Sequence, residues 1–107
     1  MGDRMWALVM FDLPTKTKTQ RREATQYRNQ LLDLGFSQVQ LSVYSKLLVN
    51  ASGIRAMLPV LRNVPPNGEV RILRLTDQQW ASTWRYYGDR EIPNHQQPEQ
   101  LLLIIGD

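Results

Sequence analysis

The sequence predicts an α+β domain whose strands and helices follow the order β-α-β-β-α-β, with one more strand near the C-terminus. Three observations predict it: short runs that are apolar on both faces, apolar residues at steps of three and four between them, and Gly, Pro and Asn clusters at the joins. The chain has 107 residues, which suits one domain with one core. Residues 1–107 are therefore expected to form a single domain.

The first strand is expected at Met5–Asp12, where seven apolar residues precede a carboxylate. Alternate side chains of a strand point to opposite faces, and both faces of this strand are apolar. Pro14 cannot donate to a strand ladder, so the strand should end at Asp12 or Leu13. Asp12 is therefore expected at the C-terminal rim of a buried strand.

The longest helix is expected at Thr15–Leu34. Thr17 and Gln20 fit a capping box, and Gly35 fits the position that follows a helix. Apolar residues at steps of three and four give this helix one core face. Its opposite side is basic, with Lys18, Arg21, Arg22 and Arg28. Such a side is either a solvated charged face or a surface for phosphate groups.

The middle of the chain is expected to hold a second strand, a short helix and a third strand. The second strand is expected at Phe36–Val49, with Leu41, Val43, Leu47 and Val49 on its buried face. A turn at Asn50–Gly53 precedes a short helix from Ile54 to Leu61, which Pro59 should kink or shift. The third strand is expected at Glu69–Leu75, again apolar on both faces.

The last third of the chain is expected to be less regular. Thr76–Trp80 fits a capped, very short helix, and Trp84–Tyr87 a fourth strand. Gly88–Gln100 is polar with two prolines and is expected to be a linker to a final strand, Leu101–Ile105. His95 has no partner at a metal-ligand spacing and is expected to be an exposed linker residue.

This order is the split βαβ pattern of ferredoxin-like folds. Two helices cover only one face of a four-stranded sheet, yet the first three strands are apolar on both faces. Leaving those side chains in water would cost several kcal/mol at ~25 cal/mol per Å². A two-fold copy of the chain is the simplest cover, so we expect a homodimer packed sheet to sheet.

Composition narrows the class of protein and partner. The chain has no cysteine, which excludes disulfides and thiolate metal sites. The N-terminal apolar run is too short for a signal peptide, and Leu101–Ile105 too short to span a bilayer, so a cytoplasmic protein is expected. The net charge is +3, and most of the cations are arginines, whose guanidinium forks suit phosphate oxygens.

Asp12 is the only carboxylate predicted at the rim of a buried strand. Mg²⁺ prefers carboxylate oxygens and often uses only one or two of them, with water and phosphate completing its shell. In a symmetric dimer, two copies of Asp12 near the axis would share such an ion. The alternative is that Asp-Leu-Pro is a turn that ends the strand. Both interpretations stay open at this point.

Short motifs with a specific spacing run along the chain. They are Phe11-Asp12-Leu13-Pro14, Arg21-Arg22, Tyr27-Arg28, Leu31-Leu32, Gly35-Phe36, Gln40 with Ser42-Val43-Tyr44, Pro65-Pro66, Gly68, Val70-Arg71-Ile72-Leu73 and Thr76-Asp77. With these motifs the chain resembles CRISPR-associated protein 2 from about Met5 to Leu103, most closely the form that accompanies type II CRISPR systems.

The resemblance implies a ferredoxin-like homodimer that is clamped by two dimers of the CRISPR integrase, CRISPR-associated protein 1. That assembly captures foreign DNA and inserts it as new spacers. The resemblance also implies a Mg²⁺-dependent endonuclease activity on RNA or double-stranded DNA, assigned to the strand-end aspartate, which is Asp12 here. In members of the family the final strand commonly pairs with the sheet of the other protomer, which suits Gln100–Ile104.

Three functions are compatible with the residues, and we rank a dimeric DNA-binding scaffold of the CRISPR adaptation complex first. Its backbone contacts would come from Lys18, Arg21, Arg22 and Arg28, without reading base sequence. The second is a metal-dependent nuclease using Asp12, for which one carboxylate per chain is a small ligand set. The third is an RNA-binding sheet with exposed aromatics, but sheet-to-sheet dimerisation would bury that face.

Overall fold

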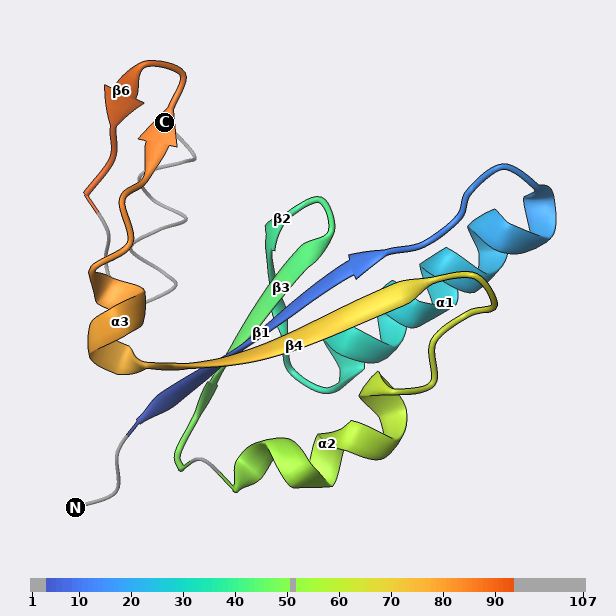
Figure 1. The fold of residues 1–107 in the computed structure, drawn as a ribbon, viewed down its shortest axis with the longest axis horizontal. Helices are drawn as coiled ribbons and strands as arrows, with labels where there is room; N and C mark the ends of the chain where they lie inside the picture. The colour runs from blue at the N-terminus through green and yellow to red at the C-terminus, as the bar shows by residue number, and fades with distance from the viewer. Residues whose placement is uncertain (1–3, 51, 94–107) are drawn as a thin grey trace.

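The computed structural model describes residues 4–50 and 52–93 of the chain (Figure 1). In this range it contains one four-stranded sheet, two longer helices, one short helix and a small two-stranded hairpin. The elements are β1 Met5–Asp12, α1 Lys18–Asp33, β2 Ser37–Gln40, β3 Val43–Leu48, α2 Gly53–Leu61, β4 Glu69–Thr76, α3 Asp77–Ala81, β5 Tyr86–Tyr87 and β6 Arg90–Glu91.

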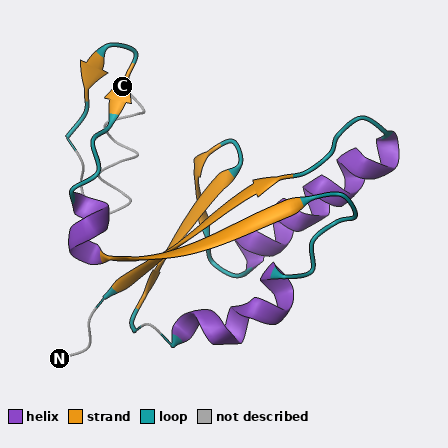
Figure 2. Cartoon of the chain, viewed as in Figure 1, coloured by secondary structure: helices purple, strands orange, loops and turns teal. Residues whose placement is uncertain are grey.

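The four-stranded sheet has the order β2-β3-β1-β4, and each pair of neighbours is antiparallel. Figures 1 and 2 show α1 and α2 on one side of this sheet. With the element order β1-α1-β2-β3-α2-β4, this is a ferredoxin-like arrangement, so the predicted fold class is confirmed. No helix among the described residues is long and apolar enough to cross a membrane.

The hydrophobic core lies between the sheet and the two longer helices. On β1, the inward side chains Ala7, Val9 and Phe11 are buried, while Tyr44 and Leu48 of β3 pack into the same cluster. The helices contribute further buried side chains, namely Tyr27 and Leu31 from α1 and Ile54, Met57 and Leu61 from α2. The apolar residues on one face of each helix and on one face of the strands therefore pack into one core.

Both predicted caps of α1 are confirmed, although the helix begins at Lys18 and not at Thr15. Thr17 is the N-cap, its hydroxyl accepts from the backbone N–H of Gln20, and the Gln20 side chain accepts from the N–H of Thr17. Gly35 follows the helix with a φ of 93°, in the left-handed region that glycine adopts without strain.

The segment Phe36–Val49, predicted as one strand, is two strands, β2 and β3, joined at Leu41 and Ser42. The predicted buried face is also wrong, because Leu41 and Val49 are 75% and 83% exposed. The side chains that enter the core are Tyr44 and Leu48, on the other face. Alternation that continues through a turn hides the turn, and a shift of one residue exchanges the two faces of the strand.

α2 forms close to its predicted bounds and includes Pro59, whose nitrogen cannot give the helical hydrogen bond to the carbonyl of Arg55. Two other expectations differ from the structure. Tyr86–Tyr87 is the only strand within the predicted fourth strand, and it pairs with β6 and not with the main sheet. β6 lies inside the predicted linker. His95, most of that linker and the predicted strand Leu101–Ile105 lie outside the described residues.

The short helix α3 packs on the sheet face opposite α1 and α2. Trp6 alternates with the inward residues of β1, and its ring lies 5.6 Å from that of Trp80 in α3. Asp77 accepts a hydrogen bond from Trp6 Nε1 at 2.7 Å and pairs with Arg4 at 3.6 Å. These contacts fix α3 at the start of β1, from where the β5–β6 hairpin extends away from the sheet (Figure 1).

Candidate nucleic-acid interface and strand-end carboxylate

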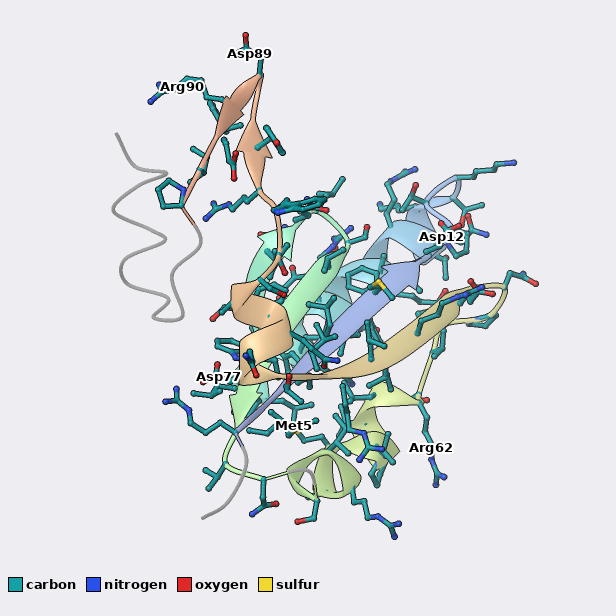
Figure 3. The ribbon with its side chains drawn as sticks, turned by 60° about the vertical axis from the view of Figure 1, so that its left-hand side comes forward. Met5, Asp12, Arg62, Asp77, Asp89 and Arg90 are labelled. Carbon is teal, nitrogen blue, oxygen red and sulfur yellow. The ribbon has the colours of Figure 1, made fainter. Side chains whose placement is uncertain are left out.

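Asp12 is the last residue of β1, and its side chain is exposed. The apolar run places the strand in the centre of the sheet, and the following Leu-Pro sequence ends it, so that the carboxylate lies at the rim. Asp12 shares its strand face with Met10 and lies opposite Glu69, the first residue of β4. Figure 3 shows Asp12 beside the loop that leads into α1, far from the hairpin that carries Asp89 and Arg90.

The carboxylates of Asp12 and Glu69 therefore share one sheet face at the same rim. Glu69 also interacts with Arg71, whose Nε lies 3.5 Å from Glu69 Oε1. Among the described residues there is no group of three or more His, Cys, Asp or Glu that would hold a metal ion. One chain thus offers Asp12, with Glu69 as a neighbour, which is the small ligand set that Mg²⁺ accepts when water and phosphate complete its shell.

The sheet face opposite α1 and α2, which we call the open face, is apolar along three strands. Its residues are Leu8 and Met10 of β1, Val43 and Leu47 of β3, and Leu73 and Leu75 of β4. Leu47 and Leu73 are 37% and 43% exposed, and the other four are partly exposed. The two-sided apolarity inferred for β1 and β4 is therefore present, and within residues 4–50 and 52–93 α3 packs over the Trp6 end of this face.

The loop between β1 and α1 is held by its own side chains. Arg21 Nη1 donates to the carbonyl oxygens of Thr15 and Lys16 at 3.2 and 3.1 Å. Gln20 Oε1 accepts from the backbone N–H groups of Lys16 and Thr17. The Arg21 guanidinium therefore helps to fix the loop that follows Asp12.

The four cations predicted to contact phosphate lie in different surroundings. Lys18 and Arg22 are exposed, and neither takes part in an ion pair with another described residue. Arg28 is partly buried, and its Nε has no hydrogen-bond partner in the described part of the chain. Lys18 and Arg22 are thus the most available of the four to bind phosphate, whereas Arg21 already donates hydrogen bonds to the loop.

The distribution of charge over the fold is uneven. All 13 Lys and Arg residues lie within residues 4–93, whereas three of the 10 acidic residues, Asp3, Glu99 and Asp107, lie outside that range. Ion pairs between described residues involve only Arg4 and Arg71 among the cations. The two helices with their adjoining loops, which we call the helix layer, hold most of the uncompensated charge. Its cations are Lys16, Lys18, Arg21, Arg22, Arg28, Arg55 and Arg62, against the acids Glu23 and Asp33.

A shallow groove of about 180 Å³ separates α1 from the connection between α2 and β4. It is lined by Glu23, Gln26, Tyr27, Gln30, Asn63, Val64, Pro65 and Pro66. At its base the hydroxyl of Tyr27 donates to the carbonyl oxygen of Leu61 at 2.7 Å. Burial raises the pKa of Tyr27 from 10.0 to about 12.

Sequence reasoning missed Glu69 and the arginines of α2. Arg55 and Arg62 are both exposed and stand seven residues apart, and no acidic residue occurs between Asp33 and Glu69. The sequence alone could have shown that these two arginines lie on the same side of the helix, because seven residues make about two helical turns. It could not have shown the pairing of Asp12 with Glu69, because that pairing depends on the register between β1 and β4.

Comparison with known proteins identifies relatives along most of the chain. The family model described as CRISPR associated protein Cas2 matches residues 5–83. A protein of Paracidovorax avenae named CRISPR-associated endoribonuclease Cas2 is 37% identical over 101 residues, which cover 94% of this chain and 94% of the relative. A protein of Streptococcus mutans with the same name is 40% identical over 101 residues, covering 94% of this chain and 93% of the relative.

A solved structure described as a crystal structure of cas2 supports the fold. It matches with a TM-score of 0.54 at 16% sequence identity, over 82% of this chain and 90% of the solved chain. At that identity the likeness concerns the fold alone.

Proposed function

This chain belongs to the family of CRISPR-associated Cas2 proteins, and we propose that it is a dimeric, DNA-binding scaffold of the CRISPR adaptation complex. In this role it acts with the CRISPR integrase, CRISPR-associated protein 1, to capture DNA and insert it as new spacers. The chemistry on DNA belongs to the integrase, and this chain supplies the surface on which the duplex lies. The motif spacing supports the form of Cas2 that accompanies type II CRISPR systems. The proposed place of action is the cytoplasm.

The uncompensated charge of the helix layer is the observation that carries this proposal. Lys18 and Arg22 project from α1 without an ion-pair partner among the described residues. Cations of this kind bind the phosphates of a duplex and release its counterions, so that affinity depends strongly on salt and little on sequence. Surface charge without base-reading geometry fits a scaffold that accepts DNA of any sequence.

The open face supports the dimer. Leu47 and Leu73 remain more than a third exposed on strands whose other faces line a packed core. A second copy related by a two-fold axis would cover the same residues on both chains at once. The two helix layers would then lie on the outer sides of the dimer, where a duplex can reach them.

A Mg²⁺-dependent endonuclease acting on RNA or double-stranded DNA is the second candidate function, because the relatives from Paracidovorax avenae and Streptococcus mutans are named endoribonucleases. Asp12, with Glu69 beside it, would hold the ion. When bound, Mg²⁺ neutralises phosphate charge and lowers the pKa of a coordinated water. The names of the relatives favour this function as much as the family assignment favours the scaffold.

One experiment separates the two functions, namely spacer acquisition in cells that supply the integrase and a repeat array. A scaffold tolerates Asp12→Asn, which removes the carboxylate charge, but loses acquisition in Lys18→Glu/Arg22→Glu. A protein that acts as a nuclease in acquisition shows the opposite pattern. Size-exclusion chromatography of both variants checks that their oligomeric state equals that of the wild type.

A further inference from the structure

The groove between α1 and the α2–β4 connection is lined on both walls by amide side chains. Gln26 and Gln30 come from α1, and Asn63 lies two residues after the end of α2. Amide N–H groups donate readily to phosphate oxygens. Pro65 and Pro66 also line the groove and offer no backbone donor, and the N–H groups of Asn63 and Val64 already donate to carbonyl oxygens, so the free donors of the groove are side chains.

Arginines stand next to both walls of this groove. Arg22 precedes Gln26 by four residues, which places the two side chains one above the other on α1. Arg62 adjoins Asn63, is exposed, and has no ion-pair partner among the described residues. Figure 3 shows the Arg62 side chain at the end of α2, pointing away from the body of the protein.

The two walls are held at a fixed distance by the protein itself. The hydrogen bond from the Tyr27 hydroxyl to the Leu61 carbonyl oxygen joins α1 to the residue just before Arg62. The N–H of Arg62 donates to the carbonyl oxygen of Leu58 at 2.9 Å, and its carbonyl oxygen accepts from the N–H of Val64 at 2.9 Å. The backbone that carries Arg62 is thus fixed on both sides.

We propose that this groove binds the sugar-phosphate backbone of duplex DNA, with Arg22 next to one wall and Arg62 next to the other. The inference rests on the proposed DNA-binding function and adds a site that includes α2. Arg55 lies two turns before Arg62 on the same side of α2, roughly 10 Å away along the helix axis. A row of cations over that length suits successive phosphates of a polymer better than one small anion. Glu23 repels phosphate, which places the backbone toward Gln26 and Asn63.

The test is a duplex-binding titration of the full-length chain at several salt concentrations. Arg62→Gln is compared with Arg90→Gln, which removes the same charge from an exposed residue of the hairpin. Loss of one phosphate contact should flatten the slope of log K against log salt by about 0.9 and lower the affinity on the order of tenfold at 0.1 M salt. Arg90→Gln should leave both nearly unchanged.

A second variant tests the amide donors separately from charge. Gln26→Ala/Asn63→Ala removes two hydrogen-bond donors, so it should weaken duplex binding. Because it removes no charge, it should leave the slope of log K against log salt unchanged. Circular dichroism establishes that each variant is folded. If Arg62→Gln behaves like Arg90→Gln while Lys18→Gln still weakens binding, the groove inference is overturned and the proposed function stands. If the wild type does not bind duplex in a salt-dependent way, both are overturned.

Discussion

The hydroxyl of Tyr27 donates a hydrogen bond to the carbonyl oxygen of Leu61 at 2.7 Å, and this bond joins the middle of α1 to the last residue of α2. Tyr27 is 2% exposed, so the bond lies in the core at the base of the groove between the helices. The arrangement of the helix layer therefore depends on one buried polar contact, in addition to apolar packing.

Tyr27→Phe should lower the free energy of unfolding by about 1 kcal/mol at neutral pH, because the Leu61 carbonyl loses its donor. It should also change stability at alkaline pH. Burial raises the pKa of Tyr27 from 10.0 to about 12, so the unfolded chain releases this proton first and the wild type loses stability between these pH values. Urea unfolding between pH 8 and pH 12 measures this loss, which should be smaller in the variant. An equal loss of stability in the wild type and in Tyr27→Phe would show that the raised pKa of Tyr27 is not its cause.

Asp77→Ala should lower the free energy of unfolding by about 1–3 kcal/mol, because Trp6 Nε1 is left without its acceptor. Arg4 loses its ion-pair partner in the same variant. Asp89→Ala is the matched control, because it removes an exposed carboxylate from the hairpin. Urea unfolding followed by tryptophan fluorescence compares the two. A midpoint for Asp77→Ala equal to that of Asp89→Ala would show that the contact does not hold α3 on the sheet.

Leu73→Lys should weaken the proposed dimer, because it places a charge in the middle of the apolar open face. The matched control is Leu32→Lys on α1, since Leu32 is 51% exposed and Leu73 is 43% exposed. Sedimentation equilibrium should show monomer for the first variant at concentrations where the wild type and the control are dimeric. Equal dimerisation of all three proteins would place the interface elsewhere.

Asp12→Asn should abolish any Mg²⁺-dependent cleavage of RNA or DNA, because the amide replaces the one carboxylate at the end of β1 and weakens metal binding. Glu69→Gln should reduce cleavage less, since Glu69 is engaged with Arg71. The measurement is cleavage of labelled substrates at increasing Mg²⁺ concentrations, with Asp33→Asn on α1 as the control. Cleavage by Asp12→Asn at the wild-type rate would exclude this residue as the metal ligand.

Much of the fold follows from local signals in the sequence. The bounds of β1 and the caps of α1 and α3 are each fixed by residues a few positions apart, such as Thr17 with Gln20 and Thr76 with Gln79. Such short-range patterns determine backbone geometry before tertiary contacts form. The two-sided apolarity of β1 and β4 likewise showed that the sheet has a second apolar face.

What the sequence concealed depends on tertiary contacts. Apolar residues that alternate with polar ones through Phe36–Val49 hid the turn between β2 and β3, and Tyr44 enters the core although Leu41 and Val43 were predicted on the buried face. The same limit applies to the site. Strand register places Glu69 beside Asp12, and Arg21 donates to the carbonyl oxygens of Thr15 and Lys16. Residue spacing in the sequence reveals neither of these contacts.

The most direct test of the DNA-binding account is the salt dependence of duplex binding by the wild type and by Lys18→Gln/Arg22→Gln. We expect log K to fall linearly with log salt, with the same slope for two duplexes of unrelated sequence, because phosphates carry no sequence information. The double variant should flatten that slope by about 1.8, the value for two lost phosphate contacts. A wild-type affinity that does not change with salt, or a slope that the double variant leaves unchanged, would contradict the account.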